Sequence, residues 1–206
     1  RRETALEAFA ARREQIAGLF ARYGTGPSAR LVLFRAPTVI FATGGLGALY
    51  AVTTNPSESR GEGLGMAARA GALIADPEFV QFHPTAIVAK CDPAPLATEA
   101  LRGRGAILVD ENGRRFMPAL HEAAELGPRD VVARAIHNEI AAGHRVFLDC
   151  RRAVGANFAS EFPTVCAACR EEGIDPVTQP IPGGPAAHYH MGGIATDTHG
   201  RSSVEG

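Results

Sequence analysis

The chain has 206 residues and a formal net charge of −1, with 46% hydrophobic and 21% charged residues. These values are typical of one large or two small globular domains. A nearly neutral chain gives no electrostatic basis for binding nucleic acid or an anionic membrane, and no apolar run reaches the ~18 residues that span a bilayer. We therefore expect no nucleic-acid partner and no membrane partner, and the sparse cysteines favour a reducing, cytoplasmic location.

The first third of the chain has the pattern of an α/β structure. A helix is predicted over residues 3–23, followed by strands over 31–34 and 38–42. The apolar residues that predict the helix are Leu6, Phe9, Ile16, Leu19 and Phe20. The run 38–42 is almost continuously apolar, as expected for a strand buried on both faces of a parallel sheet. It leads directly into a glycine-rich turn over 43–45.

The rest of the chain alternates between short helices and short strands, with candidate domain boundaries near residues 77 and 190. A strong Asn-Gly turn signal predicts a hairpin around 110–113. Helices are expected over 64–72, from Pro128 to Gly143, and over 157–172. Strands are expected over 146–149 and 194–197, and a proline-rich connection without a strand over 174–185. The middle of the chain therefore has an α+β pattern.

The four cysteines do not form a disulfide scaffold in a chain of this length. Cys166 and Cys169 are spaced as a redox or metal pair, but a helix that buries small thiols explains them better, because no second pair completes a zinc site. His188 and His190 could also ligate a metal, yet they lack a matched carboxylate. We expect no metal.

Five polar residues could together hold a small anion: His83, Thr98, Glu99, Arg129 and His188. Each also has a structural explanation. The histidines could be satisfied core residues, Thr98 could cap a helix, and Arg129 could pair with Asp130 or a nearby glutamate. Considered together, hydroxyl and imidazole donors beside an arginine are suited to a small dicarboxylate. The turn Thr43-Gly44-Gly45 could likewise approach an anion or simply be a tight turn.

Seven motifs occur in one order: ATGG (42–45), TTNP (53–56), GEG (61–63), EFVQFHPT (78–85), TEALRG (98–103), PRDVVAR (128–134) and AAHYHMGG (186–193). In this order they resemble the fumarate reductase and succinate dehydrogenase flavoprotein superfamily. The resemblance covers residues 37–206. TEALRG and PRD are more similar to the members that oxidise L-aspartate than to the respiratory members, which usually have TEG and GRD.

The resemblance implies an α+β fold, in which part of an FAD-binding Rossmann-like α/β domain carries an inserted α+β capping domain. Residues 1–76 would belong to the FAD-binding domain. Residues 77–190 would form the capping domain that closes over the substrate, and residues 191–206 would return into the FAD-binding domain.

The resemblance also implies roles for individual residues. The residues expected to contact FAD are Ala42, Thr43, Gly44, Gly45 and Glu62. Those expected to bind the substrate carboxylates are His83, Thr98, Glu99 and His188. Arg129 would be the catalytic proton shuttle. Arginine is an unusual base because its pKa is high, so this role needs a closed, dry site with a carboxylate beside it.

The implied activity is flavin-dependent oxidation of L-aspartate to iminoaspartate, the first step of bacterial NAD biosynthesis. Oxygen or fumarate would accept the electrons, with hydrogen peroxide formed from oxygen, and quinolinate synthase is the implied protein partner. Two alternatives stay open. One is a fumarate reductase or succinate dehydrogenase type of subunit acting on fumarate or succinate, and the other is a non-catalytic dicarboxylate-binding domain.

The sequence departs from the superfamily pattern at several places. It lacks the N-terminal dinucleotide fingerprint and the segment that in relatives follows Gly206 and carries a further FAD-binding glutamate and a substrate-binding arginine. Arg104 stands where relatives usually have glutamate, and Gly183-Gly184 replace a more apolar pair. The chain therefore resembles an internal segment of a longer enzyme. We expect it alone to hold FAD weakly or not at all and not to turn over aspartate.

Overall fold

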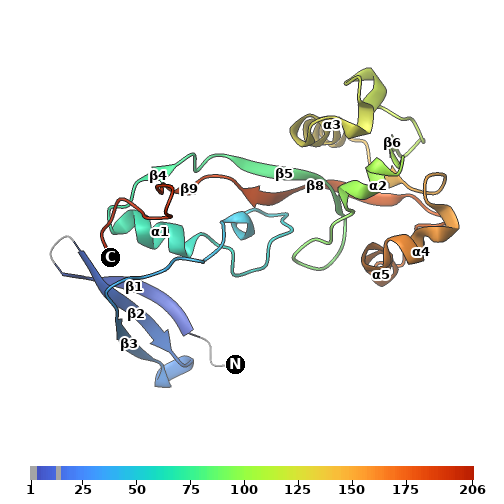
Figure 1. The fold of residues 1–206 in the computed structure, drawn as a ribbon. Coiled ribbons are helices and arrows are strands. Elements are labelled where there is room, and N and C mark those ends of the chain that lie inside the picture. Colours follow the sequence, from blue (N-terminus) through green and yellow to red (C-terminus); the bar gives the residue numbers. More distant parts are fainter. Residues whose placement is uncertain (1–3, 13–14) are drawn as a thin grey trace. The chain divides into compact units, whose positions relative to one another are not determined.

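The computed structural model describes residues 4–12 and 15–206, and the chain divides into two compact units (Figure 1). The first unit comprises residues 1–49, 59–79 and 190–206, and the second comprises residues 50–58 and 80–189. Residues 50–58 precede the main part of the second unit in sequence, yet they group with it.

Within the described residues, the first unit contains two small antiparallel sheets and one α-helix. Its elements are β1 (Thr4–Arg12), β2 (Gln15–Tyr23), β3 (Arg30–Arg35), α1 (Glu62–Arg69), β4 (Ile74–Ala75) and β9 (Gly193–Ile194). The larger sheet has the order β1-β2-β3, and β4 pairs with β9. The predicted strand over 31–34 and the predicted small-residue helix are confirmed as β3 and α1.

The helix predicted over residues 3–23 is wrong, because its described residues, 4–12 and 15–23, form the antiparallel strands β1 and β2. The middle strand β2 pairs with β1 on one side and with β3 on the other. A Cβ at Gly18 would lie 2.2 Å from the carbonyl oxygen of Phe34, so only glycine lets β2 approach β3 this closely. Pairing with a later segment thus overrides a local helical pattern.

The strand predicted over 38–42 is also wrong. This segment has no regular secondary structure, and the side chain of Ile40 is 89% exposed. The Val39 N–H donates to the carbonyl of Gly206 at 2.7 Å. A strand buried on both faces needs a ladder of partners on each side, and the two sheets of this unit are built from other segments.

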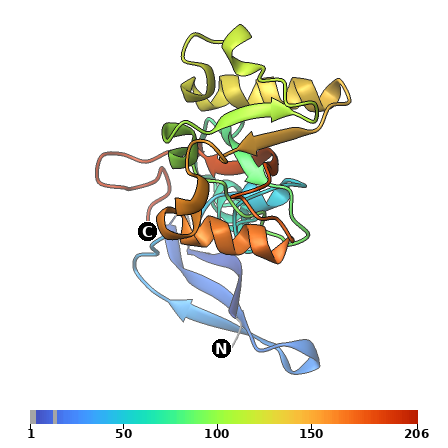
Figure 2. The ribbon, with the colours of Figure 1, turned by 90° about the vertical axis from the view of Figure 1, so that its right-hand side faces the viewer.

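The second unit is a four-stranded sheet with helices on both sides. Its elements are β5 (Val80–Ile87), α2 (Glu99–Gly103), β6 (Ile107–Asp110), α3 (Arg129–Ala141), β7 (Val146–Asp149), α4 (Phe158–Glu161), α5 (Pro163–Glu171) and β8 (Ile181–His190). The strand order is β5-β8-β7-β6. Helix α3 lies on one side of the sheet, with α4 and α5 on the other (Figures 1 and 2).

Buried apolar side chains from both helical layers and from the sheet form one continuous cluster in the second unit. Its members from the helices include Val132 and Ile136 of α3, Phe158 of α4 and Cys166 of α5. The helix predicted from Pro128 to Gly143 is confirmed as α3, and its Val132 and Ile136 face the core, whereas Ile140 is exposed. All four cysteines are free, and Cys91 alone among them is exposed.

Two predictions for the second unit need correction. The connection predicted over 174–185 includes the start of β8, in which the carbonyl of Pro182 accepts from the Val88 N–H at 3.0 Å. Proline lacks an N–H but keeps its carbonyl, so this strand tolerates prolines that the sequence pattern counts against it. The helix predicted over 157–172 is split into α4 and α5 at Pro163.

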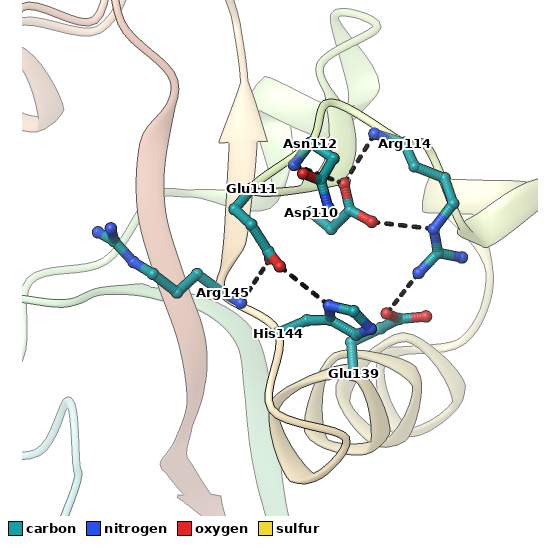
Figure 3. Close-up of polar contacts among 7 residues, drawn as sticks. All are labelled: Asp110, Glu111, Asn112, Arg114, Glu139, His144 and Arg145. Atoms are coloured by element: carbon teal, nitrogen blue, oxygen red, sulfur yellow. Dashed lines mark hydrogen bonds and ion pairs between the residues drawn. The ribbon is translucent and has the colours of Figure 1, made fainter.

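The predicted hairpin turn after β6 is confirmed, although the returning chain makes only an isolated bridge between Val109 and Arg115. Figure 3 shows how this turn is attached to the rest of the second unit. Arg114 donates to Asp110 and to Glu139 of α3, at 2.9 and 2.7 Å.

None of the helices in the described residues has the length and apolar character that a membrane span requires.

Candidate functional site

Strand β5 places two polar side chains on one face, since residues two apart in a strand point the same way. These are Gln81 and His83. His83 is buried, and its Nδ1 accepts a hydrogen bond from the Thr85 N–H at 3.2 Å. Burial, followed by the charges of His188, Arg102 and Arg129, lowers the pKa of His83 to about 3. The ring is therefore neutral at physiological pH and carries its proton on Nε2.

Strand β8 brings His188 next to His83. The two ring centroids are 5.2 Å apart, with the planes at 70°. Burial, and then the charge of Arg129, lowers the pKa of His188 as well. Its Nδ1 lies 2.7 Å from the hydroxyl oxygen of Thr54. The structure thus joins two neutral imidazoles that are about a hundred residues apart in the sequence.

Arg129 is the first residue of α3, and its guanidinium bridges two other elements. Its Nε and Nη2 lie 2.7 and 2.6 Å from Oε2 of Glu99, and Nη1 donates to Oε1 of Gln81 at 2.8 Å. The hydrogen bond from Arg129 lowers the pKa of Glu99. Glu99 supplies the negative charge that a cation at a helix N-terminus needs. Asp130, the alternative partner, pairs instead with Arg134.

Arg102 belongs to the same group of charges, and sequence analysis did not select it. Its side chain is only 1% exposed, and Nη1 donates to the carbonyl of Glu125 at 2.5 Å. Nη2 lies 3.9 Å from Oε2 of Glu99. In the described part of the chain, Nε and Nη2 have no hydrogen-bond partner. Burial lowers the pKa of Arg102, and the charge of Glu99 opposes that shift.

Thr98 caps the short helix α2. Its hydroxyl oxygen accepts from the Ala100 N–H at 3.4 Å, as the structural explanation for this residue predicted. A hydroxyl that accepts one hydrogen bond can still donate another. Thr98 therefore keeps a donor beside Glu99, and its assignment to substrate binding stays a prediction.

The residues predicted to contact FAD lie in the first unit. The carbonyl of Gly45 accepts from the N–H of Gly61, the N-cap of α1, at 3.1 Å. A Cβ at Gly63 would lie 2.0 Å from Oγ1 of Thr43, so the turn lies directly on the start of the helix. Ala42, Thr43 and Gly44 are exposed there.

An exposed glycine-rich main chain beside a helix N-terminus is suited to a phosphate or another electron-rich group. Glu62, exposed in the first turn of α1, adds a carboxylate that can accept hydrogen bonds. These residues fit part of what a flavin nucleotide requires. Their contacts with FAD stay predictions.

The second unit brings four of the predicted residues together: His83, Glu99, Arg129 and His188. Three neighbours were not among the predicted site residues, namely Thr54, Gln81 and Arg102. Gln81 could have been found from the two-residue period of a strand that already contained His83. Thr54 and Arg102 lie in motifs that the sequence shows, but nothing local indicates what their side chains contact. Among residues 4–12 and 15–206, no group of three or more His, Cys, Asp and Glu could hold a metal ion.

The family described as "FAD binding domain" matches residues 3–206 of this chain. The chain is similar to L-aspartate oxidase of Caulobacter vibrioides, with 65% identity over 176 residues, covering 85% of this chain and 34% of the relative. It is 58% identical over 181 residues to L-aspartate oxidase of Agrobacterium fabrum, covering 88% of this chain and 34% of that relative.

Among solved structures, a quinol-fumarate reductase with menaquinol molecules matches with a TM-score of 0.85 and 36% identity, covering 98% of this chain and 38% of the other. The chain thus has the mixed helix and strand fold of these flavoproteins. It spans about a third of the length of the curated relatives it matches.

Proposed function

This chain belongs to the FAD binding domain family, and we propose that it is part of an L-aspartate oxidase. The observation that carries the proposal is the cluster in the second unit, where two neutral imidazoles lie with an arginine–carboxylate pair. Identity of 65% to an L-aspartate oxidase, against 36% to a quinol-fumarate reductase, favours the oxidase over the respiratory alternative.

We propose that the first unit contributes to the FAD-binding domain and that the second unit is the capping domain. The residues predicted to contact the cofactor lie in the first unit, around the start of α1. The residues predicted to contact the substrate lie in the second unit, on β5, β8, α2 and α3. This separation matches a division of labour in which one unit holds the oxidant and the other holds the substrate.

The charges of the cluster are suited to a ligand with two carboxylates. Arg129 and Arg102 supply two positive charges, and Glu99 offsets one of them. His83 and His188 are uncharged, but a neutral imidazole can still donate one N–H to a carboxylate. The desolvation that keeps these rings neutral also strengthens their interaction with an anion. The second unit therefore offers hydrogen-bond donors and net positive charge to L-aspartate.

Arg129 is the residue we assign to proton transfer. Arginine is ordinarily a permanent cation, so it can take a proton only if it releases one at the same time. Glu99 accepts a hydrogen bond from Arg129 at 2.7 Å and is the acceptor for that proton. Gln81 holds the opposite edge of the guanidinium, which fixes the direction of transfer. A bound flavin would supply the two-electron acceptor for oxidation at the α-carbon.

In the proposed reaction, L-aspartate loses two electrons and two protons and becomes iminoaspartate. The hydrogen on the α-carbon would leave with both electrons as hydride to the two-electron acceptor, and the second proton leaves through Arg129 to Glu99. Oxygen or fumarate would take up the electrons in the complete cycle, with hydrogen peroxide formed from oxygen. An enzyme that consumes the unstable imine, such as quinolinate synthase, is the partner that this product requires.

Aspartate-dependent hydrogen peroxide formation by the full-length protein tests the proposal. Arg129→Leu should lower kcat by about a thousandfold, the scale at which a general acid or base contributes. Arg134→Leu is the matched control, because Arg134 lies on the same helix and pairs with Asp130 on the exposed surface. It should stay within about twofold of the parent. An Arg129→Leu variant that keeps a tenth of the parent kcat would contradict the assignment.

Comparing electron donors separates the oxidase from the respiratory alternative. The oxidase predicts that aspartate reduces the protein's flavin much faster than succinate does. Faster reduction by succinate would instead identify a succinate dehydrogenase type of subunit. If neither compound reduces the flavin but succinate still binds, the result would support the non-catalytic dicarboxylate-binding domain.

A further inference from the structure

A segment at the beginning of the second unit holds the end of strand β8. The main chain of Ala187 pairs with this segment in both directions, through its N–H to Val52 and through its carbonyl from Thr54, each at 3.0 Å. The Thr53 hydroxyl donates to the same carbonyl at 3.0 Å. The side-chain Nδ2 of Asn55 donates to the carbonyl of His188 at 3.1 Å. The backbone that carries His188 is therefore fixed by residues more than 130 positions earlier.

Thr54 alone in this segment reaches the imidazole. Its Oγ1 lies 2.7 Å from Nδ1 of His188, closer than any of the main-chain contacts around it. Thr53, its neighbour of the same type, bonds only to main chain and to Asn55 in the described structure. Thr53 therefore attaches the strand, whereas Thr54 contacts the imidazole ring of His188.

The hydrogen bond of His83 shows which ring nitrogen carries the proton of that neutral imidazole. A backbone N–H can only donate, so the bond from Thr85 makes Nδ1 of His83 an acceptor and leaves the proton of the neutral ring on Nε2. At His188 a hydroxyl takes the place of that N–H. A hydroxyl that donates to Nδ1 would leave His188 in the same form as His83. The opposite direction would leave a lone pair on Nε2, which would repel a carboxylate.

We propose that Thr54 is a positioning residue whose hydroxyl donates to Nδ1 of His188. It orients the ring and keeps the proton on Nε2, so that the paired imidazoles present two matching N–H donors to one dicarboxylate. The inference rests on the proposed dicarboxylate site. It assigns a role in substrate binding to the TTNP motif, which sequence analysis left without one.

Three variants of the full-length protein test the proposal. Thr54→Val keeps the shape of the side chain and removes the hydroxyl, and Thr54→Ser keeps the hydroxyl. Thr53→Val is the matched control, which removes the hydroxyl that holds the main chain. Calorimetric titration with succinate gives the dissociation constant, and nitrogen NMR of labelled histidines shows which ring nitrogen of His188 carries the proton.

We expect Thr54→Val to weaken succinate binding by about tenfold, the scale of one lost hydrogen bond with its orienting effect. Thr54→Ser should bind within about twofold of the parent. Thr53→Val should lower the melting temperature while the folded protein keeps the parent's dissociation constant and proton position. In the parent, Nδ1 of His188 should have the nitrogen shift of an acceptor, and Thr54→Val should show a mixture of both proton positions.

A parent protein with the proton on Nδ1 of His188 would overturn the proposal, and this measurement needs neither ligand nor a folded variant. Unchanged succinate binding in Thr54→Val would also overturn it. Failure of the parent to bind succinate would refute the dicarboxylate site itself. The nitrogen spectrum would then still decide the role of Thr54 at the ring, so the two failures are distinguishable.

Discussion

The two units of the chain differ in how they cover their apolar side chains. The second unit buries a continuous cluster that includes Ile136 and Phe158, both 0% exposed. The first unit leaves Leu31, Phe34 and Ile40 exposed. The described apolar cluster lies wholly in the second unit, so the stability of that unit rests on more buried apolar side chains than the stability of the first.

The two units also differ in how the residues of their candidate sites are positioned. In the second unit, other side chains form hydrogen bonds with the site residues and fix their orientation. Arg129, for example, donates to both Glu99 and Gln81. In the first unit, the candidate cofactor residues are placed by glycines and by main-chain contacts around Gly45 and Gly61. A site built from fixed side chains is already organised for a small substrate. A turn of exposed main chain instead offers backbone N–H groups, which suit the phosphates of a larger ligand.

Truncation of core residues should give the largest difference between the units. Phe158→Ala removes a fully buried ring and should lower the free energy of unfolding by about 3–5 kcal/mol. Ile40→Ala removes a side chain that is already 89% exposed, and should change stability by no more than about 0.5 kcal/mol. Denaturant unfolding of the full-length protein, followed by hydrogen exchange of each unit, measures both. Equal losses would show that the first unit buries Ile40 after all.

Ion pairs provide the next test, with a smaller effect. In the second unit Arg115 donates to the buried carboxylate of Glu125 through Nε and Nη2, at 2.9 and 2.5 Å. Although burial alone would raise it, the pKa of Glu125 is lowered by Arg115 and by the Leu108 N–H. Arg115→Met should cost roughly 1–3 kcal/mol, because it leaves a buried charge without its main partner.

The exposed pair of Arg201 and Asp197 in the first unit is the control for this experiment. Arg201→Met should change the free energy of unfolding by less than about 0.5 kcal/mol, as is usual for exposed pairs. The same unfolding measurements apply. A loss at Arg201 as large as that at Arg115 would refute the contrast between the two units.

The smallest expected effect is a pH dependence at the hairpin turn of the second unit (Figure 3). Nδ1 of His144 lies 3.0 Å from Glu111, and this hydrogen bond raises the pKa of His144. A raised histidine pKa adds stability below the ordinary value of about 6.5, and that stability is lost as pH rises through the raised value. Glu139 adds to the shift and Arg114 opposes it.

The carboxylate of the same pair titrates in the opposite sense. The hydrogen bond with His144 lowers the pKa of Glu111, so its contribution is lost only as pH falls through that lowered value. His144→Gln should therefore destabilise the protein at mildly acidic pH and become neutral at alkaline pH. Urea midpoints of parent and variant at about pH 6 and about pH 8.5 measure this. A difference that stays constant between the two pH values would contradict it.

The elements that the sequence predicts correctly are those with local signals. Pro128 marks the start of α3, and Asn112-Gly113 marks the turn after β6, because proline and glycine restrict or free the backbone where they stand. These signals suffice to place Arg129 at the start of a helix. The other candidates for the anion site come from side-chain chemistry, and the motif resemblance supplied the role of each.

The elements that the sequence predicts wrongly depend on distant partners. The helical pattern over 3–23 is overridden because β2 pairs with β3, and the buried strand over 38–42 is absent because the sheets of this unit are built from other segments. The contact between Thr54 and His188 joins residues 134 positions apart. A periodicity over ten residues contains no information on such contacts, so they could come only from the fold.

The most direct test is a structure of the full-length protein with bound succinate. The account predicts that the succinate carboxylates lie within hydrogen-bond distance of Nε2 of both His83 and His188. The guanidinium of Arg129 should face the carbons between those carboxylates while it keeps its contact with Glu99. Succinate bound elsewhere, with both imidazoles unliganded, would contradict the account.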